Sequence, residues 1–115
     1  MATPEGTIQL AVMKYLKSEG VFSWRNNNQG SYDRKRGIYV SNPYIMRGVP
    51  DIIAVIPAEN NIGQFVGFEV KTPKGRQSPD QKLYEKRLTK HGGRYFIVRS
   101  VADAKQALLE LGYLN

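Results

Sequence analysis

Residues 50–56 form a nearly continuous apolar run, and this run limits the folds that are open to the chain. A short run without polar alternation predicts a strand buried on both faces, which places it in the middle of a sheet. A second strand is expected over residues 64–71, after a turn over residues 57–63. Because the connection is short, the two strands should pair in antiparallel fashion.

Three helices are expected around this pair of strands. Thr3, Ser78 and Ser100 are suitable N-cap residues, and proline follows the first two at the favoured first helical position. Glycines at positions 20, 92–93 and 112 mark the helix ends. Further strands are expected over residues 21–25 and 94–98. The order is helix, three strands, helix, strand, helix, which predicts an α/β fold with a mixed β-sheet flanked by helices.

The segment between the strands expected over residues 21–25 and 50–56 is less regular. Residues 26–31 have the composition of a loop, and residues 33–36 continue it as a charged tip. Residues 37–40 could form a short return strand, which residues 41–43 would break.

Composition excludes several classes of protein. The 115 residues and a hydrophobic fraction of 41% predict one domain over residues 1–115. The absence of cysteine excludes disulfides, a thiol nucleophile and a Cys-ligated zinc site, and a lone His91 excludes a His-rich site. Since no apolar stretch approaches the ~20 residues of a membrane span and no signal peptide is evident, we expect a cytoplasmic protein without a membrane partner.

The charge balance indicates what kind of molecule the chain binds. Lysine and arginine number 17 against 10 acidic residues, which gives a net charge of +7. Such a charge on a small domain favours a polyanionic partner, most simply nucleic acid. A basic protein without such a partner is the alternative.

Three charged residues stand where the two long strands meet. Glu69 and Lys71 are two apart near the end of one strand, so their side chains share a face. Asp51 begins the other strand, and antiparallel pairing would bring it beside Glu69. A solvated ion pair and a strand-start aspartate are the ordinary explanations of these residues.

The functional explanation is a metal site. Adjacent carboxylates repel unless a cation lies between them, and Mg²⁺ prefers such oxygen ligands. A metal bound there could activate water and stabilise charge on an attacked phosphodiester. Lys71 could orient that water or offset the charge of the transition state.

The wider pattern resembles a known family. Gly48-Val49-Pro50-Asp51, Glu69-Val70-Lys71 and the run from Gly75 to Gln81 (Gly-Arg-Gln-Ser-Pro-Asp-Gln) follow one another in order. This set resembles the virus-type replication-repair nuclease (VRR-NUC) domain of the PD-(D/E)XK nuclease superfamily, over essentially the whole chain. The order of helices and strands matches the restriction-endonuclease-like core of that superfamily.

The resemblance implies Mg²⁺- or Mn²⁺-dependent cleavage of DNA. Asp51 and Glu69 match the metal-binding acids, and Lys71 matches the catalytic lysine. Glu5 matches a further metal-binding acid of the first helix, with Glu19 as the other candidate; a first-turn acid is also favoured by the helix dipole. Gln81 matches a glutamine next to the active site, but it could equally close a capping box with Ser78.

Several residues are candidates for holding the DNA backbone: Arg25, Asn26, Arg47, Lys74 and Arg76. Trp24 and the tyrosines could stack on unpaired bases or belong to the core. Because no base-reading module is recognisable, sequence-specific cleavage is not expected.

Stand-alone VRR-NUC members are associated with phages, so the resemblance implies a homodimer acting on branched DNA such as four-way (Holliday) junctions in a bacterial host. A small domain would also gain binding area from a second subunit. An end-processing or restriction-like nuclease on ordinary duplex is an alternative. A catalytically inactive DNA-binding protein is another, although the intact set of Asp51, Glu69 and Lys71 argues against it.

Overall fold

The structure, a computed structural model, describes residues 3–26, 31–33, 35–40 and 46–115. The apolar run forms β4 (Ile52–Pro57). This strand lies inside a four-stranded sheet of order β1-β4-β5-β6, as its composition predicts. It pairs antiparallel with β1 (Phe22–Arg25) and with β5 (Gly63–Val70), and β6 (Arg94–Val98) pairs parallel with β5.

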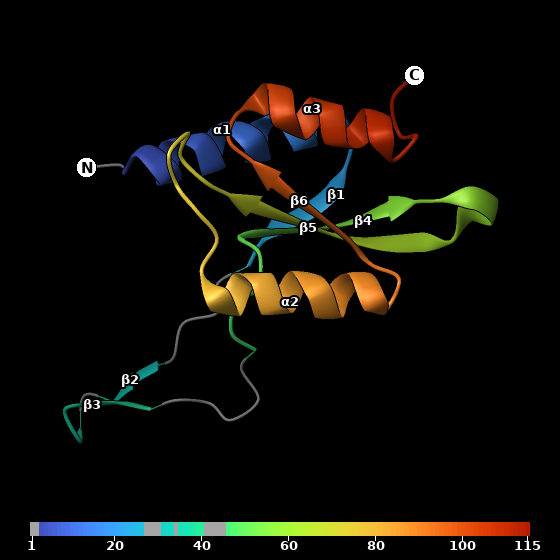
Figure 1. The fold of residues 1–115 in the computed structure, drawn as a ribbon. Coiled ribbons are helices and arrows are strands. Elements are labelled where there is room, and N and C mark those ends of the chain that lie inside the picture. The colour runs from blue at the N-terminus through green and yellow to red at the C-terminus, as the bar shows by residue number, and fades with distance from the viewer. Residues whose placement is uncertain (1–2, 27–30, 34, 41–45) are drawn as a thin grey trace.

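Helices cover both faces of this sheet. α1 (Pro4–Ser18) and α3 (Val101–Glu110) lie together on one face, and α2 (Pro79–Lys90) lies on the other (Figure 1). The expected caps are all present, because the side chains of Thr3, Ser78 and Ser100 each accept a hydrogen bond from a first-turn N–H. The mixed α/β fold predicted from the sequence is confirmed.

The hydrophobic core lies between the sheet and the α1–α3 layer. Phe68, Leu16 and Leu108 are fully buried there, and the ring of Phe68 stacks on Phe96 at 6.0 Å between centroids. The residues of β4 and β5 that alternate with this core face α2, so the sheet carries its chemistry on the α2 side.

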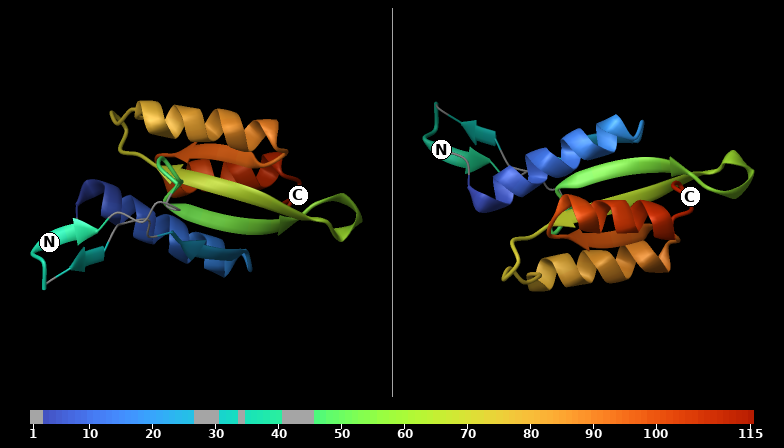
Figure 2. Two further views of the ribbon diagram at one scale, coloured as in Figure 1. Left: turned by 90° about the horizontal axis from the view of Figure 1, so that it is seen from below. Right: turned by 90° about the horizontal axis from the view of Figure 1, so that it is seen from above.

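A second, two-stranded sheet projects from the body of the protein. β2 (Ser31–Asp33) pairs antiparallel with β3 (Ile38–Val40), at the end opposite the β4–β5 turn (Figure 2). The expected return strand is confirmed as β3. The assignment of its partner to loop and charged tip was wrong, because three residues of mixed polarity carry no strand signal. Arg34 of that tip and the break at residues 41–43 lie outside the described residues.

Two smaller features complete the description. The expected turn over residues 57–63 contains a short 3₁₀ helix, η1 (Glu59–Asn61). No helix in the described parts of the chain is long and apolar enough to span a membrane.

Candidate active site

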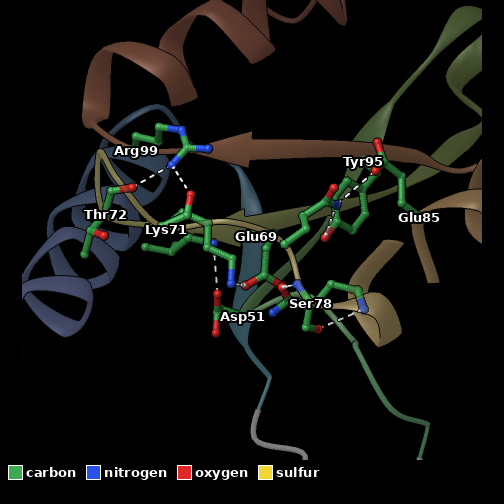
Figure 3. Close-up of polar contacts among 12 residues, drawn as sticks. Asp51, Glu69, Lys71, Thr72, Ser78, Glu85, Tyr95 and Arg99 are labelled. Carbon is green, nitrogen blue, oxygen red and sulfur yellow. Dashed lines mark hydrogen bonds and ion pairs between the residues drawn. The ribbon is translucent and has the colours of Figure 1, made fainter. Parts of the chain in front are cut away.

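The strand register brings the two predicted acids together. Ile52 pairs with Phe68 across β4 and β5, so Asp51 lies opposite Glu69, as the hairpin argument predicts. The Oδ2 atom of Asp51 accepts a hydrogen bond of 2.8 Å from the backbone N–H of Val70. This bond holds the carboxylate of Asp51 against the end of β5 (Figure 3).

The neighbouring strand and helix enclose the side chain of Glu69. Gly67 pairs with Tyr95 of β6, and the ring of Tyr95 contacts that of Tyr84 on α2. Because Glu69 is two residues from Gly67, its side chain emerges on the same α2 face. Only 2% of Glu69 is exposed, and its buried Oε1 atom has no hydrogen-bond partner among the residues that the structure describes. An orphaned carboxyl oxygen at this depth is costly unless a further group satisfies it.

The surroundings of Glu69 make its carboxyl group hard to ionise. Burial, first, and then the interaction with the Asp51 carboxylate raise the pKa of Glu69 to about 9. Glu5 raises this pKa further, and Lys71 acts in the opposite direction. Glu69 therefore keeps its proton near neutral pH, and a cation bound beside it would favour the charged carboxylate instead.

Lys71 stands beside the acids. Its Nζ atom lies 3.9 Å from Oε2 of Glu69, and 12% of its side chain is exposed. That distance is too long for a strong hydrogen bond. The backbone is held more firmly, because the N–H of Lys71 donates to the carbonyl of Val98 at 3.0 Å. Lys71 thus projects from a fixed strand end without being locked to Glu69.

Close contacts explain the glycines around the Gly-x-Pro-Asp sequence before β4. Gly48 has a φ of +75°, and a Cβ there would lie 2.3 Å from the carbonyl oxygen of Asp80 in α2. A Cβ on Gly67 would lie 2.6 Å from Cγ of Pro50. The segment leading to Asp51 therefore passes between the sheet and the start of α2, where only glycine fits at both contacts.

Gln81 makes the capping contacts in this structure. Its Oε1 atom accepts from the N–H of Ser78 at 2.8 Å, and its own N–H donates to Oγ of Ser78 at 3.2 Å. The capping box is therefore formed. Gln81 still lies close to the site, because the backbone of Asp80–Gln81 is what Gly48 packs against.

The two first-helix acids occupy different ends of α1. Glu5 lies in the first turn, near enough to influence the pKa of Glu69. Glu19 is the C-cap at the far end, where its carbonyl accepts from the hydroxyl of Tyr113. Among the described residues, no three acidic or histidine side chains gather into a ready-made metal cluster. Glu5 therefore does not join Asp51 and Glu69 in a three-residue cluster here.

The predicted DNA-binding residues surround this end of the sheet. Arg25, Arg47, Lys74 and Arg76 are exposed. Asn26 is half-buried, and its backbone N–H donates to the carbonyl of Asp51 at 2.8 Å, which links the end of β1 to the start of β4. Further along β1, Trp24 and Phe22 are 40% and 70% exposed, with ring centroids 5.3 Å apart.

Sequence reasoning did not identify two polar residues that hold the site together. Gln77 donates from Nε2 to Oε1 of Glu85 at 2.9 Å and to the hydroxyl of Tyr95 at 3.3 Å. Arg99 binds backbone carbonyls of the turn that follows Lys71. Neither role has a local sequence signal, because the partners are up to 27 positions away.

Comparison with known proteins identifies the family and supports the fold. The sequence profile of the VRR-NUC domain matches residues 3–102. The chain belongs to the VRR-NUC domain family. No curated protein matches it, but solved structures of two VRR-NUC proteins do. A structure titled "VRR_NUC domain" is 23% identical, with a TM-score of 0.62, and the match covers 95% of this chain and 97% of the other.

The second structure, titled "VRR_NUC domain protein", is 17% identical, with a TM-score of 0.70. It is covered over 93% of its length and matches 100% of this chain. At these identities the two structures establish a shared fold. Family membership identifies the chain as a nuclease of the PD-(D/E)XK type, and its substrate as DNA.

The residues at the sheet end fit a divalent cation. Asp51 and Glu69 supply the hard carboxylate oxygens that Mg²⁺ and Mn²⁺ prefer. The Oε1 atom of Glu69 has no hydrogen-bond partner among the described residues, so it is a carboxyl oxygen that a cation could bind.

Proposed function

We propose that this VRR-NUC domain is a Mg²⁺- or Mn²⁺-dependent endonuclease that selects branched DNA. The observation that carries the metal dependence is the buried, orphaned oxygen of Glu69 beside the half-buried carboxylate of Asp51. In this proposal Asp51 and Glu69 hold the cation, and water and phosphate oxygens complete its coordination. Glu5 contributes negative charge, either through water or after a small movement of α1.

The bound cation would supply Lewis-acid stabilisation and a more acidic water. The chain's own residues do the remaining work. Glu69 gives up its proton when the cation binds, because the charged form is then the favoured one. The backbone N–H of Lys71 is bound to Val98 of β6, which fixes the residue. Its side chain orients the attacking water and offsets negative charge on the phosphoryl oxygens.

The exposed cations hold the DNA backbone on either side of the scissile bond. Lys74 and Arg76 lie in and just after the turn that follows Lys71, Arg25 ends β1 next to β4, and the polar Asn26 follows it. Arg47 precedes the Gly48–Asp51 segment. Such contacts position the duplex without reading its sequence. Gln81 remains a candidate active-site residue, which would have to exchange its capping contact for one with DNA.

Branched DNA and a homodimer are proposed from size and symmetry. One small domain covers little DNA outside its active site, and an isologous dimer would present two sites related by a two-fold axis. A four-way junction offers two equivalent strands to such a pair. Two alternatives remain within reach of experiment, a nuclease acting on ordinary duplex or its ends and an inactive DNA-binding protein.

The experiment that separates these functions is a cleavage panel. Linear duplex, flap and four-way junction substrates of matched sequence are incubated with Mg²⁺, Mn²⁺ or EDTA. The proposal predicts fastest cleavage of the junction with either cation and none with EDTA. Equal rates on linear duplex would favour the duplex nuclease, and binding without cleavage under all conditions would favour the inactive protein.

A further inference from the structure

The turn that follows the proposed catalytic lysine is built as a separate unit. The N–H of Gly75 donates to the carbonyl of Thr72 at 3.0 Å, which closes a four-residue turn. A Cβ on Gly75 would lie 3.1 Å from Oγ1 of Thr72, so the turn is also tight. Lys74 lies in this turn and Arg76 directly after it, and both are exposed.

Arg99 binds the inner side of this turn. Its Nη1 atom donates to the carbonyl of Thr72 at 2.6 Å and to that of Gly75 at 2.7 Å, with a third contact of 3.5 Å to Pro73. Figure 3 shows the side chain reaching from the end of β6 to the turn. Hydrogen bonds from a charged donor are stronger than neutral ones, so this contact fixes the turn more firmly than its own backbone bond.

Arg99 is itself anchored to the body of the protein. Its backbone N–H donates to Oδ2 of Asp103 at 2.8 Å, at the point where Ser100 caps α3. The preceding residue, Val98, accepts the backbone bond from Lys71. The end of β6 therefore holds both the strand that carries Lys71 and the turn that carries Lys74.

We propose that Arg99 is a positioning residue that fixes Lys74 and Arg76 for contact with DNA. The proposal rests on the proposed function, in which those two cations bind the phosphate backbone. Arg99 acts through the carbonyls of the turn and makes no contact with DNA of its own. The loss of Arg99 should therefore weaken DNA binding only through the displacement of Lys74 and Arg76.

A double-mutant cycle separates this role from a direct phosphate contact. DNA affinity is measured for wild type, Arg99→Ala, the Lys74→Ala/Arg76→Ala pair and all three changes together. Two lost phosphate contacts should reduce the slope of log affinity against log salt by about 2. Positioning predicts that Arg99→Ala lowers affinity in the wild-type background and changes it less than about twofold when Lys74 and Arg76 are already alanine. If the fold-losses in affinity of Arg99→Ala and of the Lys74→Ala/Arg76→Ala pair simply multiply in the triple variant, the proposal is overturned.

Trypsin gives a second readout that does not involve DNA. Lys74 and Arg76 are themselves trypsin sites, so loosening of the turn should expose them. Arg99→Ala should speed cleavage there roughly tenfold, while cleavage in α2 at Lys86 keeps its wild-type rate. Unchanged cleavage at Lys74 and Arg76 would contradict the proposal. If alanine prevents folding, which circular dichroism would show, Arg99→Gln replaces it in both measurements.

Arg94 provides the matched control. It lies at the other end of β6, with its guanidinium carbon 5.3 Å from the centre of the Phe96 ring. Arg94→Ala also removes one positive charge. It should leave trypsin cleavage of the turn at its wild-type rate, and its effect on DNA affinity should be the same whether or not Lys74 and Arg76 are alanine. If the Lys74→Ala/Arg76→Ala pair bound DNA normally, the DNA-binding part of the proposed function would fail instead, and the trypsin rates would decide whether Arg99 holds the turn.

Discussion

At the scale of single residues, the buried carboxyl group of Glu69 links stability to pH. Its pKa is about 9 in the folded protein, well above its ordinary value, so the folded state holds this proton more tightly than the unfolded state. The stabilising effect of that proton is complete below the ordinary pKa and is lost as the pH rises toward 9. Each pH unit within this window removes up to about 1.4 kcal/mol from the free energy of unfolding.

Comparison with Glu69→Gln isolates this effect. Glutamine has the shape of the protonated glutamate but does not titrate. The melting temperature of the variant should therefore rise above that of wild type, and the difference should grow from pH 5 to pH 9. A loss of 1 kcal/mol corresponds to roughly 4 °C in a domain of 115 residues. Thermal unfolding in EDTA measures both proteins, and parallel pH curves would contradict the raised pKa.

Lys71 should affect turnover and leave metal binding nearly unchanged. Lys71→Ala removes the group that acts on water and transition-state charge but no metal ligand, so kcat should fall by roughly 100-fold or more. Calorimetric titration with Mn²⁺ should give a dissociation constant close to that of wild type. A turnover that fell only in proportion to a lost metal affinity would assign Lys71 a different role.

At the scale of the elements, the site depends on how closely the segment before β4 approaches α2. Gly48→Ala adds a Cβ 2.3 Å from a backbone oxygen at a φ of +75°. Overpacking and backbone strain together should cost about 2 kcal/mol or more. Gly92→Ala is the matched control, since Gly92 has a φ of +88° and no described residue lies within 4 Å of where its Cβ would be. Chemical denaturation should show the larger loss for Gly48, and equal losses would mean that the contact with α2 is unimportant.

Several features of the helices and strands could be predicted from the sequence. The apolar run of β4 and a short connection were enough to predict that Asp51 lies beside Glu69, because antiparallel pairing puts the start of the first strand next to the end of the second. The caps at Thr3, Ser78 and Ser100 were predictable because capping is a local interaction. The short strand β2 was missed, since its three residues lack alternation.

Other contacts at the site arise only from the tertiary fold. The close approach of Gly48 to Asp80 and the bonds of Arg99 to the Thr72–Gly75 turn join segments more than 20 positions apart. Periodicity and propensity contain no information on such pairs. For Gln81, a local pattern and a family resemblance predicted different contacts, and the local capping box is the one formed.

At the scale of the whole molecule, the net charge of +7 will make the protein bind any DNA at low salt, whatever the structure of that DNA. The proposed dimer should therefore be tested near physiological salt, where each phosphate contact has lost part of its contribution. Light scattering should give the mass of two chains. Strand-labelled four-way junctions should be cut at symmetry-related positions, faster than linear duplex. A monomer that cuts both substrates equally would exclude the dimeric junction enzyme and leave the metal site untouched.

The central claim is that the Asp51–Glu69 pair holds the cation that drives cleavage. The most direct measurement is the cleavage rate of Asp51→Asn and Glu69→Gln with saturating Mg²⁺ or Mn²⁺, with DNA binding followed in parallel. Losing several kcal/mol of transition-state stabilisation should lower each rate by roughly 100-fold or more. DNA binding should stay equal or become stronger, because negative charge is removed near the phosphates. Full activity in either variant would contradict the claim.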